Sequence, residues 1–386
     1  MPLTPPQSSL QLPPLSLYIH IPWCVRKCPY CDFNSHQADE FLPEQEYITA
    51  LLADLQRDLH WVQGREIHSI FIGGGTPSML SVKAFDDLFS GLKQHLTFSH
   101  DIEITMEANP GTFEAEKFAG YRKLGINRLS IGIQSFQDHQ LKELGRIHSG
   151  TEAVAAVKMA KDAGFDNFNL DLMHGLPGQD LKLALSDLAQ AIELKPTHIS
   201  WYQLTIEPNT EYFKSPPNLP QDETLWDIQE AGQTLLSDNG FSQYEISAYS
   251  KPGKSSRHNM NYWQFGDYLG IGAGAHGKIT IPADNKILRS NKTRAPKDYL
   301  NTNKIQSVNI TEIEPEDRDL EFFMNALRLY EGTDFEIFEQ RTGLSIEHCR
   351  HKLEQAITAG LIEPGDQIKT TSKGQLFLNE LLEKFL

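Results

Sequence analysis

Short apolar runs alternate with amphipathic segments over roughly the first 240 residues of the chain. Six runs are nearly continuous in apolar residues, which is typical of buried parallel strands. They are residues 15–21, 69–73, 102–107, 128–133, 168–173 and 199–204. The segments between them carry apolar residues at three- and four-residue steps, which predicts helices. These helices are expected over residues 44–60, 82–97, 113–124, 151–163 and 179–194.

This alternation predicts an α/β fold built from right-handed βα units. Six units are fewer than the eight of a closed barrel, so a partial, open β/α barrel is expected over residues 15–240. After that the pattern changes to a Gly-rich run at 268–277, a hairpin around 278–290 and helical stretches from about 313. We therefore expect an extension over 241–310 and a smaller α+β, winged-helix-like C-terminal domain over 311–386.

The first fourteen residues are rich in Pro, Ser and Gln, and we expect residues 1–14 to be disordered. They lack the basic start and apolar core of a secretory signal. No apolar run approaches the roughly 18 residues of a membrane span. A cytoplasmic location is therefore expected.

The formal net charge is −16, which repels nucleic acid at long range. An anionic ligand would therefore have to be held by local basic residues. We expect no nucleic-acid partner.

Three of the four cysteines lie close together, directly after the first predicted strand. Cys24, Cys28 and Cys31 have the spacing C-x3-C-x2-C, whereas Cys349 stands alone in an amphipathic helix and is expected to be an inert buried thiol. A loop after a barrel strand lies on the catalytic face. Three thiolates can hold a 4Fe–4S cluster and leave one iron open for a ligand.

A zinc site is the alternative interpretation of these cysteines. It would need a fourth ligand, and His20, Asp32 or His36 could supply one. The three-residue first gap is unusual for a zinc knuckle, so spacing and context favour iron–sulfur.

Polar residues interrupt the apolar pattern where successive strands end. The run 73–77, Gly-Gly-Gly-Thr-Pro, follows the second strand, and Glu107, Gln134 and Asp171 lie at the ends of or within the next three. Burying such groups is unfavourable unless they are paired, and three at successive strands favour a bound ligand over internal hydrogen bonds. Arg146 could pair with a carboxylate of that ligand, and it could equally be a solvated arginine at a helix end.

The cysteine spacing after a first strand resembles the radical-SAM signature. In that family the open iron chelates S-adenosylmethionine (SAM), and one electron cleaves SAM to a 5′-deoxyadenosyl radical. Further motifs make the resemblance more specific: YIHIPWCVRKCPYCDFNSH, FIGGGTPS, EANPGT, RLSIGIQSF, NLDLMHGLPGQ and HNMNYW. Together they resemble the oxygen-independent coproporphyrinogen III oxidase family from about residue 15 to the C-terminus. Within it they look most like a heme-chaperone branch.

The resemblance implies roles for particular residues. It assigns the cluster to Cys24, Cys28 and Cys31. The first SAM would contact Tyr18, Gly74, Glu107 and His276 or its neighbours. In the oxidase branch a second SAM contacts positions that match Tyr30, Gly75, Thr76, Gln134, Arg146, Asp171 and Thr205.

Two departures separate this chain from the oxidase branch. That branch has a long segment before the first strand, where this chain has about fourteen residues, and a further cysteine where this chain has Phe33. Both departures argue against porphyrinogen decarboxylation. No catalytic residue is therefore assigned.

The run HNMNYW matches a heme element of the chaperone branch. His258 would be the axial ligand, and Tyr262 and Trp263 would present flat faces to the macrocycle. Without the resemblance, a loop histidine beside core aromatics is the better interpretation. Upstream cations at Lys251, Lys254 and Arg257 could pair with heme propionates.

The expected function is therefore heme uptake and delivery to acceptors such as respiratory enzymes. A radical-SAM enzyme and a zinc-stabilised binding module are the competing functions. The sequence leaves open whether heme drives dimerisation or docking to a membrane.

Overall fold

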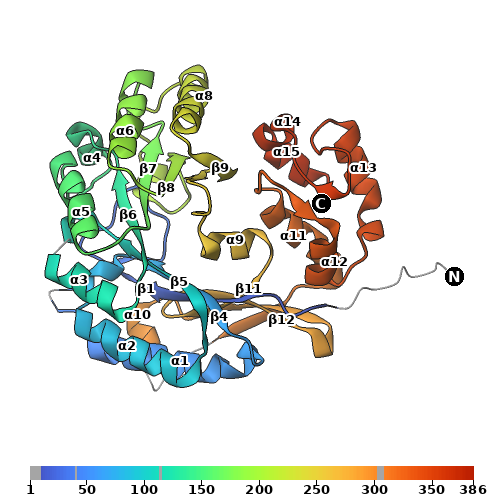
Figure 1. Ribbon diagram of the computed structural model, residues 1–386, viewed down its shortest axis with the longest axis horizontal. Coiled ribbons are helices and arrows are strands. Elements are labelled where there is room, and N and C mark those ends of the chain that lie inside the picture. The colour runs from blue at the N-terminus through green and yellow to red at the C-terminus, as the bar shows by residue number, and fades with distance from the viewer. Residues whose placement is uncertain (1–9, 40, 113–114, 302–307) are drawn as a thin grey trace.

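The computed structural model describes residues 10–39, 41–112, 115–301 and 308–386. A single twelve-stranded sheet organises most of this part of the chain (Figure 1). Its strand order is β14-β13-β12-β11-β1-β4-β5-β6-β7-β8-β10-β9. Because β14 and β9 are its two edges, the described sheet is open, as the sequence predicted.

The six predicted strands form the parallel centre of the sheet, and their side chains are mostly buried. They are β1 (Leu15–Ile21), β4 (Ile67–Gly74), β5 (Phe98–Ala108), β6 (Arg128–Gln134), β7 (Phe168–His174) and β8 (His198–Gln203). Helices follow them in sequence: α1 (Glu44–Asp58), α2 (Val82–His95), α3 (Ala115–Leu124), α4 (Asp138–Glu143), α5 (Gly150–Asp162), α6 (Leu181–Glu193), α7 (Glu211–Lys214) and α8 (Asp222–Asp238). The predicted partial β/α barrel is confirmed.

Local signals in the sequence set where several of these helices begin. The Ser149 hydroxyl accepts the backbone N–H of Glu152, and the Glu152 carboxylate accepts the Ser149 N–H, which forms a capping box at the start of α5. The Asp180 side chain accepts the Leu183 N–H at the start of α6. These caps satisfy backbone donors that have no partner within the helix.

The extension predicted over residues 241–310 adds strands to the same sheet, while its exact boundaries stay a prediction. Its strands pair with both edges of the parallel centre: β10 is antiparallel to β8, and β11 is parallel to β1. The elements are β9 (Ser242–Glu245), β10 (Ala248–Ser250), α9 (Arg257–Trp263), β11 (Asp267–Ile271), β12 (His276–Ile281), β13 (Lys286–Asn291), α10 (Pro296–Tyr299) and β14 (Asn309–Glu312). The chain crosses from one edge to the other through α9, which lies between the sheet and the C-terminal module (Figure 1).

The C-terminal module is a small α+β unit with its own apolar core. Phe322, Phe323, Phe338 and Phe385 pack together at its centre. The last of the helical stretches expected after residue 313 divides into two short helices at Phe377. The elements are α11 (Arg318–Ala326), β15 (Thr333–Asp334), α12 (Phe335–Thr342), α13 (Arg350–Thr358), β16 (Gln367–Ile368), α14 (Ser372–Leu376) and α15 (Leu378–Glu383). Within the described chain, no helix has both the length and the apolar character needed to cross a membrane.

Residues 10–14 are ordered, so the prediction of disorder over 1–14 is wrong for this part. Leu10 is buried in the core of the C-terminal module, and the Gln11 N–H donates to the Gln340 carbonyl at 2.9 Å. The Pro13 carbonyl accepts Nη1 of Arg65 at 3.0 Å. Burial of Leu10 and these two hydrogen bonds therefore order a segment whose composition favours disorder. Residues 1–9 lie outside the described residues.

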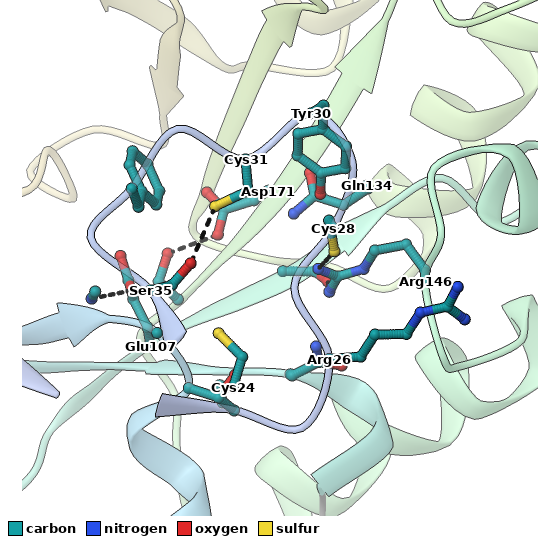
Figure 2. A pocket seen from close by; sticks show the side chains of 18 of the residues that line it. Cys24, Arg26, Cys28, Tyr30, Cys31, Ser35, Glu107, Gln134, Arg146 and Asp171 are labelled. Atoms are coloured by element: carbon teal, nitrogen blue, oxygen red, sulfur yellow. Dashed lines mark hydrogen bonds between the residues drawn. The ribbon is translucent and has the colours of Figure 1, made fainter. Parts of the chain in front are cut away.

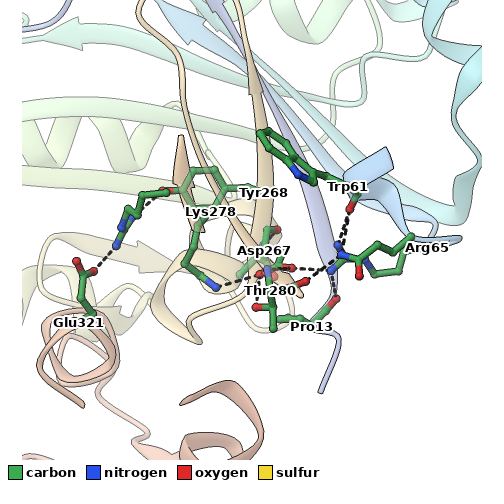
Figure 3. A network of polar contacts seen from close by, with 11 residues as sticks. Pro13, Trp61, Arg65, Asp267, Tyr268, Lys278, Thr280 and Glu321 are labelled. Atoms are coloured by element: carbon green, nitrogen blue, oxygen red, sulfur yellow. Dashed lines mark hydrogen bonds and ion pairs between the residues drawn. The ribbon is translucent and has the colours of Figure 1, made fainter. Parts of the chain in front are cut away.

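A buried carboxylate at the start of β11 joins the N-terminal segment, the barrel and the hairpin (Figure 3). Asp267 accepts hydrogen bonds from Arg65 at 2.8 Å, from Lys278 at 3.0 Å, and from the backbone N–H and hydroxyl of Thr280, both at 2.8 Å. Burial alone would raise the pKa of Asp267, but Lys278 and Arg65 outweigh burial and lower it. The Asp267 carbonyl also accepts the Asn261 side-chain amide at 2.8 Å, which ties α9 to this network.

Replacing Asp267 should therefore destabilise the whole fold. Asp267→Ala leaves the Lys278 ammonium, which is 2% exposed, without its counter-ion. Loss of one partner of a buried pair costs about 3–5 kcal/mol, so we expect the free energy of unfolding to fall by that amount in urea titrations. The exposed Asp284→Ala variant is the control. Equal stability of the two variants would contradict the role of this network.

Candidate functional site

The cysteine loop connects β1 to α1 and is held by a short parallel strand pair. β2 (Trp23–Cys24) pairs with β3 (His36–Gln37), and the Ala38 N–H donates to the Cys24 carbonyl at 2.8 Å. The Cys31 N–H donates to the Cys28 carbonyl at 3.2 Å, which closes a tight turn. This frame brings all three cysteines to the edge of one cavity (Figure 2).

The cavity has a volume of about 320 Å³, and the three thiols are half-buried in its wall. Burial raises the pKa of Cys24 and Cys31 above the ordinary thiol value. Nη1 of Arg146 lies 3.7 Å from Sγ of Cys28, and the Ser35 hydroxyl lies 3.6 Å from Sγ of Cys31. Cationic and hydroxyl donors at these distances favour thiolates, which are the form that binds iron.

The zinc alternative finds no fourth ligand in this cavity. Both ring nitrogens of His20 are engaged, one by the Tyr18 hydroxyl and one by the Asn34 carbonyl, each at 2.9 Å. Neither Asp32 nor His36 lines the cavity. Among the described residues, no group of three His, Cys, Asp or Glu side chains is arranged to hold a single metal ion. None of the three residues proposed as a fourth zinc ligand joins the three thiols, and three thiols fit an iron–sulfur cluster with one open iron.

The glycine loop after β4 passes so close to the cysteine loop that a side chain cannot fit. A Cβ atom on Gly75 would lie 2.4 Å from the Trp23 carbonyl oxygen. Gly74 has φ of +111°, a conformation that favours glycine, and its N–H donates to Oε2 of Glu107 at 3.0 Å. Thr76 follows and lines the cavity beside Cys24. The tight approach keeps backbone groups at the cavity wall.

The carboxyl groups of Glu107 on β5 and Asp171 on β7, the two strands that flank β6, both line the cysteine cavity. Burial, and then the nearby Asp171 carboxylate, raises the pKa of Glu107 to about 8. Burial also raises the pKa of Asp171, although hydrogen bonds from Ser130 at 2.9 Å and Asn169 at 2.7 Å oppose this shift. Two carboxyl groups without a described cation between them form a site for a positively charged or ammonium-bearing ligand.

Arg146 and Gln134 also line the cavity, with Gln134 beside Asp171 (Figure 2). Arg146 points into the cavity, where Nη2 donates to the Gly132 carbonyl at 2.6 Å, so the solvated alternative is wrong for this arginine. Its Nε is buried without a hydrogen-bond partner in the described chain. Gln134 has φ of +72°, and its Oε1 accepts the Tyr202 hydroxyl at 2.8 Å. A cation and carboxyl groups in one cavity suit a zwitterion.

Most of the residues predicted for the site therefore come together. The cavity contains Cys24, Cys28, Cys31, Tyr30, Gly74, Gly75, Thr76, Glu107, Gln134, Arg146 and Asp171. Tyr18 and His276 instead line an adjoining cavity of about 400 Å³, which shares Phe33, Gly74 and Glu107 with the first. Thr205 lies outside both, with its hydroxyl on Oε1 of Glu207 at 2.8 Å.

The sequence argument missed further cavity residues on β6, on β8 and in the loops. They are Arg26, Ser35, Asn109, Ser130, Ser200 and Tyr202. The signal for the strand residues was the two-residue period: Ser130 and Gln134 share one face of β6, and Ser200 and Tyr202 share one face of β8.

Of the predicted heme trio, His258 is buried, whereas Tyr262 and Trp263 are half-buried. His258 is 1% exposed, with Nδ1 on the Ser69 hydroxyl and Nε2 on the Tyr262 hydroxyl, both at 2.9 Å. Burial lowers its pKa to about 3, so the imidazole is neutral. Tyr262 packs edge-on against Tyr268, and the Arg328 guanidinium covers the Trp263 ring at 4.4 Å. Axial ligation by His258 stays a prediction that requires α9 to move.

Comparison with known proteins agrees with this fold. The sequence matches the Radical SAM superfamily over residues 18–188 and the HemN C-terminal domain over residues 313–377. The solved coproporphyrinogen III oxidase HemN of Escherichia coli superposes with a TM-score of 0.82 at 22% identity, covering 97% of this chain and 90% of that chain. The protein therefore has the fold of HemN-like radical-SAM proteins.

Curated relatives define the family more narrowly. The heme chaperone HemW of Escherichia coli is 54% identical, with 98% of this chain and 99% of the relative covered. Those of Haemophilus influenzae and Bacillus subtilis are 55% and 33% identical, with 97% and 96% of this chain and 99% of each relative covered. The chain belongs to the HemW family.

The three cysteines should be required for iron. Cys24→Ser, Cys28→Ser or Cys31→Ser should each abolish iron and sulfide incorporation and the broad visible absorption after anaerobic reconstitution. Cys349→Ala should retain both, because burial raises the pKa of the Cys349 thiol to about 12 and it lies in the C-terminal core. Stoichiometric zinc without iron in the wild type would contradict the iron–sulfur interpretation.

Glu107 should make the stability of the metal-free protein depend on pH. The folded state keeps the Glu107 proton up to about pH 8, whereas the unfolded chain loses it near the ordinary carboxyl pKa. Stability from this group is thus fully present below the ordinary value and is lost as pH rises toward about 8.

Glu107→Gln removes this dependence. Between about pH 5 and about pH 8.5, the melting temperature of this variant should therefore rise relative to that of wild type. The corresponding gain in the free energy of unfolding is at most about 1.4 kcal/mol per unit of pKa shift. The exposed Glu116→Gln variant should show no such rise. A pH-independent difference for Glu107→Gln would mean that this carboxyl is ionised throughout.

Proposed function

We propose that this protein is a cytoplasmic heme chaperone that binds heme and transfers it to heme-requiring acceptors such as respiratory enzymes. The supporting observation is 54% identity to the heme chaperone HemW of Escherichia coli along nearly the whole of both chains. The motif HNMNYW lies on α9. Met260 and Asn261 face a groove beside the first residues of β1 and β4, whereas Tyr262 lines the cavity that adjoins the cysteine cavity.

A SAM-bound 4Fe–4S cluster forms the second part of the proposal. Cys24, Cys28 and Cys31 would hold it, and the cluster would supply an open iron for SAM and a single electron. The carboxyl groups of Glu107 and Asp171 would receive the SAM ammonium or ribose, and Arg146 would receive its carboxylate. Gln134, positioned by Tyr202, would donate its amide to the same ligand. These residues would orient SAM and exclude water from it.

His258 is proposed as a heme ligand in an opened state. Its neutral imidazole has the protonation state that iron requires, but both ring nitrogens are occupied while α9 is closed. Release of the Tyr262 hydroxyl would free Nε2 toward the space between α9 and β4. Ligation by His258 should therefore be limited by the rate of this opening. Tyr262 and Trp263 would then contact the macrocycle.

A radical-SAM enzyme is the second candidate function, and the complete cysteine cavity favours it. Glu107, Gln134, Arg146 and Asp171, four of the polar groups predicted to contact SAM, line this cavity together. Against oxidase activity stands Phe33, which is 60% exposed at the position of the oxidase branch's further cysteine. Heme-driven dimerisation and contact with a membrane surface are further proposals that the chaperone function would accommodate.

One reconstituted sample can separate the two functions. We expect wild-type protein to give a Soret band on heme titration and to activate a heme-free respiratory enzyme when mixed with it. His258→Ala should slow or weaken binding because it removes one ligand, whereas His60→Ala on the exposed surface should not. With reductant, SAM and coproporphyrinogen III, the same sample should form no protoporphyrinogen. Many turnovers without heme transfer would contradict the chaperone function and establish the enzyme.

A further inference from the structure

A groove of about 440 Å³ opens at the end of the barrel opposite the cysteines. The first residues of β1 and β4 form one wall, and α9 with the turn before it forms the other. His68, Ser69, Arg257, Met260 and Asn261 are among its lining residues. The groove thus lies directly beside the HNMNYW helix but on a face that is already open.

Two side chains of the types that can ligate heme iron line this groove. His68 is exposed, and no hydrogen bond between described residues occupies its ring nitrogens. Met260 is half-buried on α9, across the groove from β4. Imidazole and thioether form a known axial pair for heme iron. By contrast, both ring nitrogens of His258 are engaged inside the protein.

A β-bulge directs His68 out of the sheet. In the pairing of β4 with β1, the consecutive residues Leu15 and Ser16 face Ile67 and Ser69, so His68 is the extra residue. Bulges re-aim side chains and are common beside functional sites. A structural role in the sheet ladder therefore does not explain this histidine.

The rim and floor of the groove also suit a porphyrin. Arg257 is exposed at the rim, where Nη1 contacts the Asp101 carbonyl at 2.8 Å and its carboxylate at 2.7 Å. A surface ion pair of this kind is weak, so a propionate can take its place. On the floor, Ser69 lines the groove and also holds Nδ1 of His258. Ser69 therefore contacts both the groove and His258.

We infer that heme first docks in this groove, with His68 and Met260 as iron ligands and Arg257 bound to a propionate. The inference rests on the proposed function and assigns it an entry site. Docking here needs no movement of α9, and the open groove leaves one edge of the macrocycle exposed. Such an exposed cargo can pass to an acceptor protein. Transfer to His258 would follow only after α9 opens.

Heme titration and stopped-flow mixing of the full-length protein test this entry site. His68→Ala should weaken heme binding at least about tenfold, equivalent to about 1.4 kcal/mol, and should remove the fast, concentration-dependent phase. Met260→Leu keeps the side-chain volume but should abolish the near-infrared sulfur-to-iron charge-transfer band of the ferric complex. His100→Ala, an exposed histidine at the start of β5 outside the groove, is the matched control and should change neither property.

The outcomes distinguish the entry site from the function. Wild-type affinity, kinetics and spectrum in both groove variants would overturn the entry site and leave the chaperone function intact. An equal loss in His100→Ala would also overturn it, because binding would then be a property of surface histidines in general. If the wild-type protein bound no heme, the proposed function itself would fail, and the entry site with it.

Discussion

Parallel pairing of β1 and β4–β8 is the constraint on which both proposed sites depend. Strands that run in one direction place all their carboxyl ends at one rim of the sheet and all their amino ends at the other. The cysteine loop, the glycine loop, Glu107 and Gln134 therefore converge at the first rim although they are far apart in the sequence. At the opposite rim, the starts of β1 and β4 meet α9. The groove beside α9 and the cysteine cavity therefore lie at different rims of one sheet, although Tyr262 of α9 reaches the cavity that adjoins the cysteines.

The cysteine cavity is electrostatically prepared for a zwitterion. Glu107 and Asp171 are buried near each other, and the energetic cost of that arrangement appears as the raised pKa of both groups. An ammonium group bound between them would relieve it. Arg146, whose Nε lacks a partner in the described chain, offers a carboxylate its complement in the same cavity. Binding of such a zwitterion to the folded protein would therefore stabilise the fold.

Sequence periodicity predicted the strands, the helices and most of the cavity residues because local sequence patterns indicate which positions are buried and in which direction the strands run. Glu107, Gln134 and Asp171 were found for this reason. Arg146 could not be decided, because the direction of a side chain at a helix end depends on a distant carbonyl, that of Gly132. Tyr202 was missed although it shares one face of β8 with Ser200, and its hydrogen bond to Gln134 shows how it contributes to the cavity.

Long-range contacts explain the remaining differences. Leu10 is ordered because the C-terminal module, more than 300 residues away in sequence, provides its pocket. His258 is buried because Ser69 and Tyr262 bind its two nitrogens, and no local pattern around HNMNYW contains that information. Because these contacts keep α9 closed over His258, we infer that heme enters at another site. Burial of the motif and exposure of His68 are thus two consequences of one arrangement.

The central claim is that heme and the iron–sulfur cluster occupy opposite ends of one parallel sheet. Anomalous diffraction at the iron edge, from crystals of the reconstituted and heme-loaded protein, would locate both groups directly. We predict one iron site at Cys24, Cys28 and Cys31 and a second beside α9 at the start of β4. Heme iron inside the cysteine cavity, or no iron at the three cysteines, would contradict this account.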